Sequence, residues 1–215
     1  MSFLTAGSKA GPILSLSGDL RSTANVTTCG ASCTLGPGNS DGDYAQWAVF
    51  VVSFNIPTPE TVQIVTFSYG GGANGTGTLI SQGGLEPYLS LFDAVGSFLA
   101  STYFGITCPS VANTNSSSGQ CYDVLLDAGS LPAGSYQVAI SAYANMSLAE
   151  NAGTGTLGDG FTGLGNLFPG EDLHYAFDID LGAASPLAPA PEPDAFGLVA
   201  VAAVAFLGIK KGKRS

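Results

Sequence analysis

The chain has 215 residues, of which 45% are hydrophobic and only 10% charged, with 30 glycines and 12 prolines. This balance is typical of a loop-rich β domain, because Leu, Glu, Lys and Ala would dominate a helical one. Residues 1–190 hold 14 of the 16 acidic side chains and only Lys9 and Arg21 as bases, which gives them a formal charge of −12. The charge argues against a nucleic-acid partner, since phosphate neutralisation requires clustered Lys and Arg.

Eight segments with alternating hydrophobic and polar residues predict β-strands, and Gly, Asn, Asp and Pro clusters separate them. The predicted strands are Pro12–Ser17, Ala48–Ile56, Thr61–Tyr69, Tyr88–Phe92, Phe98–Phe104, Cys121–Leu126, Tyr136–Ala142 and Leu173–Leu181. We therefore expect an all-β fold in residues 1–182, an antiparallel β-sandwich or jelly roll of about eight strands. Hydrophobic side chains occupy both faces of Ala48–Ile56, with Val49 and Val51 opposite the longer apolar row, which predicts a central strand covered on both sides.

The four cysteines are candidates for disulfides, because their number is even and the chain has features of an exported protein. Three connectivities are possible. We favour Cys29 with Cys33 and Cys108 with Cys121, since each pair lies in a Gly/Ser/Asn-rich stretch that can bend to meet the geometry of a bridge. A structural zinc site is the competing interpretation, but these spacings are not those of zinc knuckles.

Few residues are suited to catalysis. The single histidine, His174, is predicted to lie on the polar face of the last strand together with Asp178 and Asp180, which is typical of a solvated strand face. A carboxylate pair of the glycosidase type is the alternative for the two aspartates. The chain has no G-x-S-x-G, no H-E-x-x-H and no phosphate loop, so we expect no enzymatic activity.

Four aspartates in glycine-rich loops are candidate calcium ligands, namely Asp41, Asp43, Asp93 and Asp159. Hard oxygen ligands on such turns are what Ca²⁺ requires. Asp-Gly is also a common turn dipeptide, and the twelve-residue EF-hand spacing does not occur. We therefore expect no obligatory cofactor, with Ca²⁺ as the metal to test.

The C-terminal end has three parts in a fixed order. Residues 183–194 form a Pro/Ala-rich linker that contains Pro191, Glu192 and Pro193, and residues 195–215 contain an apolar run followed by basic residues. The apolar run, Ala195–Ile209, predicts a helix of roughly 22 Å, short of the ~30 Å hydrocarbon core of a bilayer. The basic residues are Lys210, Lys211, Lys213 and Arg214. They are expected to stay cytoplasmic, which leaves the body of the protein on the outer side of the membrane.

This order resembles the PEP-CTERM sorting domain of Gram-negative bacteria, in which a Pro-Glu-Pro motif, a membrane helix and an Arg/Lys cluster close the chain. The resemblance covers roughly Pro191 to Ser215. It implies recognition by an exosortase, a membrane-embedded cysteine transpeptidase, and processing near the motif after an inner-membrane intermediate. The protein would then reach the cell surface or the extracellular matrix. An ordinary tail anchor is the alternative, and it also places the domain outside the cytoplasm.

A second resemblance lies in the body of the chain, from roughly Tyr44 to Leu181. The segments Glu86–Ala94 and Leu131–Ser141 are similar to the paired hallmarks of bacterial pre-peptidase C-terminal-like domains, and Asp159-Gly160-Phe161 resembles a late loop of exported PEP-CTERM proteins. The resemblance implies a compact jelly-roll sandwich that is not itself a catalyst. It also implies a strand that ends in a turn at the first segment and a Pro-Gly turn before a late strand at the second.

The first residues do not resemble a signal peptide. Met1 to Ser17 has Lys9 in its middle, with Gly and Pro where a signal helix would lie. A sorting signal requires an entry signal, so we expect the true start to lie upstream, where an in-frame hydrophobic leader would be found.

Two classes of function fit these features. The first is a structural or adhesive surface or biofilm-matrix protein with no activity of its own. The second is a module that binds carbohydrate, in particular exopolysaccharide, for which Tyr69, Tyr103 and Tyr143 are candidate stacking faces. A hydrolase is a distant third interpretation.

Overall fold

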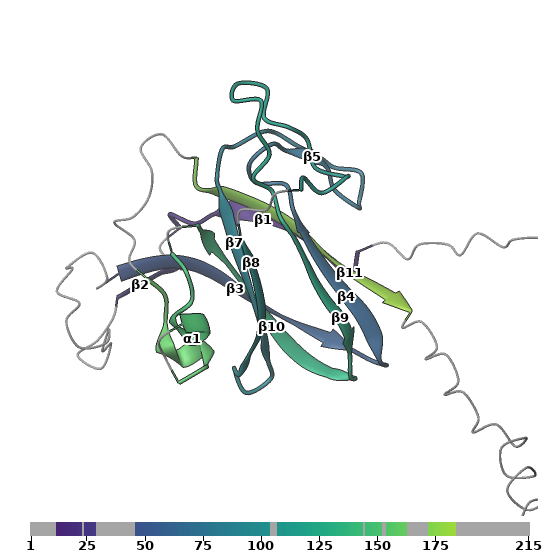
Figure 1. The fold of residues 1–215 in the computed structure, drawn as a ribbon, viewed down its shortest axis with the longest axis vertical. Coiled ribbons are helices and arrows are strands. Elements are labelled where there is room, and N and C mark those ends of the chain that lie inside the picture. The colour runs from purple at the N-terminus through teal and green to yellow at the C-terminus, as the bar shows by residue number, and fades with distance from the viewer. Residues whose placement is uncertain are drawn as a thin grey trace, which may run out of the picture. The chain divides into compact units, whose positions relative to one another are not determined.

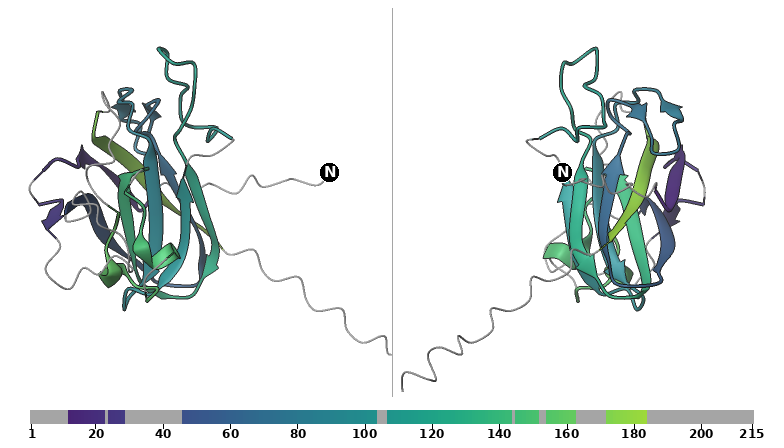
Figure 2. Two further views of the ribbon diagram at one scale, coloured as in Figure 1. Left: turned by 60° about the vertical axis from the view of Figure 1, so that its left-hand side comes forward. Right: turned by 90° about the vertical axis from the view of Figure 1, so that its right-hand side faces the viewer.

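Two antiparallel sheets form the body of the protein and face one another as layers (Figures 1 and 2). The computed structural model describes residues 12–22, 24–28, 46–103, 107–143, 145–151, 154–162 and 172–183. The four-stranded sheet contains, in order, β1 (Leu14–Asp19), β11 (His174–Ala183), β4 (Glu60–Thr66) and β9 (Leu125–Leu131). The five-stranded sheet contains β2 (Val26–Thr28), β3 (Gln46–Ile56), β10 (Gly134–Ala142), β7 (Pro87–Asp93) and β8 (Phe98–Tyr103).

The smaller elements lie in the connections. β5 (Gly72–Ala73) and β6 (Leu79–Ile80) form a two-stranded sheet at one end of the sandwich, between β4 and β7 in sequence (Figure 1). The connection from β10 to β11 holds α1 (Leu148–Asn151) and the 3₁₀ helix η2 (Leu157–Asp159). The order of elements therefore takes the chain repeatedly from one sheet to the other.

The main core lies between the two sheets and follows from the alternation of the strands. Alternate side chains of β4 and β11, such as Ile64 and Ile179, point inward and meet Leu91 and Val138 from β7 and β10. All of these four side chains are fully buried. The sequence prediction of an all-β antiparallel sandwich is confirmed in the described part of the chain.

Each of the eight predicted strands has a counterpart, and the segment around Cys121–Leu126 is the one that differs most. The strand there begins at Leu125 and continues to Leu131, because Asp123 bonds to the turn after β4 and the Val124 amide donates to the Thr66 hydroxyl at 2.8 Å. The Thr66 amide donates to the Val124 carbonyl at 3.0 Å, so the contact with β4 ends at Val124, and Asp123 bonds to the turn after β4 instead. A turn follows β7 after Asp93, and β10 begins at Gly134, two residues after Pro132.

The prediction for β3 is right in part. Val49 is buried on the outer face of its sheet, but Val51 is 40% exposed. β3 is therefore covered on both faces at Val49 but not at Val51.

Nearly all of the predicted C-terminal segments, from residue 184 onward, fall outside the described residues. β11 ends at Ala183, which is the first residue of the predicted linker, and the rest of the linker, the apolar run and the basic residues follow it outside the described residues. Within the described ranges, none of the helices has the length and apolar character needed to cross a bilayer.

Candidate functional site

A cleft of about 410 Å³ opens on the outer face of the four-stranded sheet. β4, β9 and β11 provide its floor, while the segment before β1, the β5 region and residues 109–111 provide its walls. The lining residues are Pro12, Gln63, Val65, Phe67, Ala73, Asn74, Gly75, Pro109, Ser110, Val111, Leu125, Asp178 and Asp180. This volume is within the range of small-molecule sites in proteins.

The cleft combines apolar surface with negative charge. Val111 and Leu125 are 46% and 44% exposed, so large hydrophobic side chains remain accessible at the cleft. Its charged lining residues are Asp178 and Asp180. Arg21, the only Lys or Arg among the described residues, lies outside the lining and pairs with Asp19, with a nitrogen–oxygen distance of 2.5 Å.

Asp178 is only 2% exposed, so the prediction of a solvated side chain is wrong for this residue. The Ser15 hydroxyl donates to its Oδ1 at 2.5 Å, and the Gly75 amide donates to its Oδ2 at 2.6 Å. Gly75 can approach because it has no side chain: a Cβ there would lie 2.5 Å from Cδ of Pro12. Periodicity along a strand predicts the face that a side chain takes, but not the loop that covers this face.

Asp180 lies two residues farther along the same face of β11, is half-buried and also lines the cleft. His174, at the start of β11, is half-buried and is not part of the lining. The structure thus brings the two aspartates together in one cleft and leaves the histidine apart from them.

Three consecutive glycines allow the wall of the cleft to pack closely. A Cβ on Gly70 would lie 1.8 Å from the carbonyl oxygen of Asn113, and Gly71 has a φ of +72°. The Asn113 amide donates to the Gly71 carbonyl at 2.9 Å, and Gly72 forms a β-bridge with Ala112. These contacts hold the segment after β8 against the β5 region, which explains why glycine is required there.

A second buried aspartate, Asp123, holds the turn that precedes this wall. Its carboxylate accepts hydrogen bonds from the amides of Ser68 at 2.6 Å, Tyr69 at 3.1 Å and Gly70 at 2.8 Å, and from the Thr66 hydroxyl at 2.9 Å. Burial raises the pKa of the Asp123 carboxyl, while these same donors act in the opposite direction. Every donor belongs to one turn, so the carboxylate fixes the path of the chain after β4.

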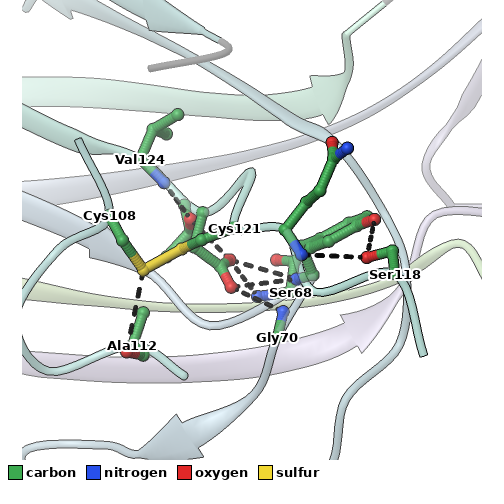
Figure 3. Close-up of a disulfide and its surroundings, with 11 residues drawn as sticks. Ser68, Gly70, Cys108, Ala112, Ser118, Cys121 and Val124 are labelled. Atoms are coloured by element: carbon green, nitrogen blue, oxygen red, sulfur yellow. Dashed lines mark hydrogen bonds between the residues drawn. A yellow bond between two sulfur atoms is a disulfide. The ribbon is translucent and has the colours of Figure 1, made fainter. Parts of the chain in front are cut away.

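The disulfide between Cys108 and Cys121 lies beside this turn, next to Ser68 and Gly70 in Figure 3. It closes the loop that contains residues 109–111 of the cleft wall. The predicted pairing of Cys108 with Cys121 is confirmed. Cys29 and Cys33 lie outside the described residues.

The candidate tyrosines divide into two groups. Tyr69 is 8% exposed, and its ring packs edge-on against Tyr122 with centroids 4.6 Å apart, so it offers no open face. Tyr103 is 41% exposed, and its ring lies 5.6 Å from that of Tyr143 at an interplanar angle of 36°. This pair lies on the five-stranded sheet, since Tyr103 is opposite Tyr88 in the β7–β8 ladder.

The two candidate calcium ligands that the structure describes both act as acceptors in turns. Oδ1 of Asp93 accepts the amides of Val95 at 3.0 Å and Ser97 at 2.7 Å, and the backbone hydrogen bond from Ser97 lowers the pKa of Asp93. Asp159 accepts the Thr156 amide at 2.8 Å in a capping box of η2. Burial raises the pKa of Asp159, but its hydrogen bonds outweigh this effect, and the pKa lies below its ordinary value.

Within the described ranges, no three His, Cys, Asp or Glu side chains gather in a metal-binding group. The other predicted sites lie outside the described residues: Asp41, Asp43, Pro191, Glu192, Pro193, Lys210, Lys211, Lys213 and Arg214.

Sequence reasoning missed Asp123 and the cleft itself. The hydrogen-bond partners of Asp123 are more than 50 residues away in sequence, so no local sequence pattern predicts these contacts. A weak signal for the cleft was present in Gly70, Gly71 and Gly72, because consecutive glycines after a strand indicate a close approach of two backbones.

Comparisons with known proteins returned no relative. A scan against models of protein families, a search of curated proteins and a search of solved structures each gave no match.

Proposed function

We propose that this protein is exported from a Gram-negative bacterium and sorted through its C-terminal segment to the cell surface or the extracellular matrix. There its β-sandwich acts as a structural or adhesive module without catalytic activity. The observation that carries the proposal is the order of Pro191-Glu192-Pro193, an apolar run and a basic end at the C-terminus. Exosortase is its transient partner, and the membrane holds it before processing.

The strand order supports the finer description of the fold as a jelly roll. Taken without β2, the sheets have the orders β1-β11-β4-β9 and β3-β10-β7-β8. In each sheet the last strand or the next-to-last strand of the chain is inserted between earlier strands, as in two nested Greek keys. The second resemblance implies the same architecture.

The use of buried polar groups also supports a structural role. The Asp123 carboxylate accepts hydrogen bonds from the turn after β4, and the Ser141 hydroxyl donates to the carbonyl of Asn145 at 2.6 Å. Asp93 and Asp159 cap turns in the same way. Side chains that hold loops in place, together with a disulfide, suit a module that must remain folded outside the cell.

The intact mass of the protein recovered from a host with its own exosortase tests the sorting proposal. We expect a C-terminus near Pro191–Pro193, with or without an added group. A variant with Ala at Pro191, Glu192 and Pro193 should retain the full mass, whereas a control with Ala at Pro186 and Pro189 of the linker should be processed. A wild-type mass that still includes Lys210–Ser215 would make this a tail-anchored protein and would refute sorting by exosortase.

Carbohydrate binding is a second candidate function, and the Tyr103–Tyr143 pair favours it. An accessible ring next to a second ring offers a stacking surface for a sugar. Titration with purified exopolysaccharide, with and without Ca²⁺, tests this function. Tyr103→Ala should weaken binding about tenfold, while Val95→Ala, a change at another exposed side chain, should not. Equal affinities for the two variants would exclude the tyrosine pair as the site.

A further inference from the structure

The cleft on the four-stranded sheet contains a buried carboxylate, that of Asp178, which has fewer hydrogen-bond donors than the other buried carboxylate, that of Asp123. Asp178 is buried, and its two hydrogen bonds come from neutral donors, the Ser15 hydroxyl and the Gly75 amide. Asp123 is equally buried but has four donor groups. Buried charges are normally paired or fully hydrogen-bonded. Asp178 is itself 2% exposed, so an external cation would enter the cleft beside the half-buried Asp180, and Asp178 would add to the negative potential there.

The charges of the site determine the class of ligand. Asp178 and Asp180 lie two residues apart on one face of β11, and none of the lining residues is Lys, Arg or His. A cation that enters the cleft is attracted by both carboxylates, and the low dielectric of a partly closed site strengthens this attraction. An anionic ligand would be repelled by the same pair.

The walls of the cleft distinguish an organic cation from a metal ion. Val111 and Leu125, which are 46% and 44% exposed, provide accessible hydrocarbon surface, and a metal ion would make no use of it. An ammonium group on a carbon ring makes use of both kinds of surface, because its charge meets the carboxylates while its C–H face covers the apolar side chains.

The neutral polar side chains favour a sugar as the body that carries the ammonium group. Gln63, Asn74 and Ser110 contribute amide and hydroxyl groups to the lining, and such groups both donate to and accept from sugar hydroxyls. The aliphatic side chain of a lysine has no hydroxyls to match them.

From these observations we propose that the cleft binds the protonated amino group of an amino sugar, with Asp180 as the group that meets the charge and the buried Asp178 adding to the negative potential. The exposed side chains of Val111 and Leu125 contact the ring. This site is separate from the Tyr103–Tyr143 pair, and its operation does not depend on the route by which the protein is sorted.

Calorimetric titration of the purified full chain with a glucosamine trimer tests the proposal, with the N-acetylated trimer as the neutral control. We expect the amine-bearing trimer to bind about tenfold or more tightly than the acetylated one, because acetylation removes the charge that the carboxylates recognise. Added salt should weaken the binding of the amine alone. Equal affinities, tighter binding of the neutral trimer or no binding of either would overturn the proposal.

Two variants locate the binding site. Asp180→Asn removes one charge from the cleft and should weaken binding of the amine about tenfold, whereas Glu60→Gln removes a charge from β4 outside the lining and should leave it unchanged. Leu125→Arg places a positive charge at an exposed position of the lining and should abolish binding, with Leu125→Gln as the uncharged control. Both positions are at least partly accessible to solvent, so the variants are expected to fold. Unchanged affinity in Asp180→Asn and Leu125→Arg would show that the amine binds elsewhere and would refute the site.

Discussion

The two outer faces of the sandwich are covered in different ways. On the five-stranded sheet, Tyr88 and Phe92 lie beneath Ala149 and Phe161 of the connection between β10 and β11. All four of these side chains are less than 10% exposed. On the four-stranded sheet, the β5–β6 region and the loop closed by the disulfide bury Val65 and Phe67, but Val111 and Leu125 beside them remain more than 40% exposed and line the cleft.

The difference shows how a connection can serve either packing or recognition. The connection over the five-stranded sheet contributes apolar side chains to a second core, and Glu150 accepts the hydroxyl of the buried Tyr88 at 2.6 Å. The connections over the four-stranded sheet are held mainly by polar contacts, in particular those of Asp123 and Asp178. A face held in this way keeps its shape without being filled, which is what a binding site requires.

The largest expected effect on the free energy of unfolding comes from truncating one apolar side chain on each face and comparing the two losses. Phe161→Ala should lower the free energy of unfolding by about 3–5 kcal/mol, because it leaves a cavity above the five-stranded sheet. Leu125→Ala, on the cleft, should change it by no more than about 0.5 kcal/mol. Urea unfolding followed by fluorescence measures both. Similar losses would mean that the cleft face is packed as tightly as the other and would contradict the comparison.

Removal of the disulfide tests how the cleft wall is held. Cys108→Ser combined with Cys121→Ser should lower the free energy of unfolding by about 3 kcal/mol, since the bridge closes a short loop and restricts the unfolded chain. Reduction of the wild-type protein should destabilise it at least as much in thermal unfolding, because reduction also opens the predicted Cys29–Cys33 bridge. An unchanged free energy of unfolding in the double variant would mean that the Cys108–Cys121 bridge does not hold the cleft wall.

Asp123→Asn should have a somewhat smaller effect, about 1–3 kcal/mol, because an amide NH₂ group would face backbone N–H donors that now bond to a carboxylate oxygen. Asp127→Asn is the matched control, since Asp127 is exposed and accepts one backbone amide, that of Gly129. If both variants unfold at the same denaturant concentration, the buried carboxylate does not hold the turn after β4.

The smallest effect concerns Asp19, a partly exposed carboxylate that is not part of the cleft lining. The side-chain hydrogen bond from Arg21 lowers the pKa of Asp19 to about 2, below its value of 3.8 in the unfolded chain. The ionised form therefore contributes stability above about pH 4, and this contribution is lost as the pH falls toward 2. Because the pair is exposed to solvent, the contribution is small and is reduced by salt.

Asp19→Asn should flatten the dependence of stability on pH between about 4 and 2, and Arg21→Gln should do the same. Thermal unfolding at a series of pH values measures this slope. An unchanged slope in both variants would show that the pair contributes nothing, and the acid sensitivity would then belong to other carboxylates.

The strands could be predicted from the sequence where burial follows period two. Hydrophobic and polar residues alternate along β10 and β11 because each strand has one face in the main core. The pairing of Cys108 with Cys121 could also be predicted, because the two cysteines are close in sequence. β9 was displaced by several residues, since Asp123 bonds to the turn after β4 and the Val124 amide bonds to the side chain of Thr66. The residues that decide where β9 begins are far away in sequence, so a short stretch of sequence does not reveal these contacts.

The candidate site could be predicted only in its parts. The sequence placed Asp178 and Asp180 on one outer face, but the loop that buries Asp178 depends on the approach of Gly75 to Pro12. Tyr69 was a candidate stacking face, but it packs against Tyr122 and is buried. In each case the sequence predicts the direction of a side chain, and tertiary packing decides whether solvent reaches it.

The most direct test of the difference between the two faces is a map of amide chemical-shift changes in the full chain during titration with the glucosamine trimer. We predict that the changes concentrate on the cleft, at Gly75, Val111, Leu125 and Asp180. Changes that concentrate around Tyr103 and Tyr143, or the absence of any change, would contradict the assignment of the four-stranded sheet as the open, ligand-binding face.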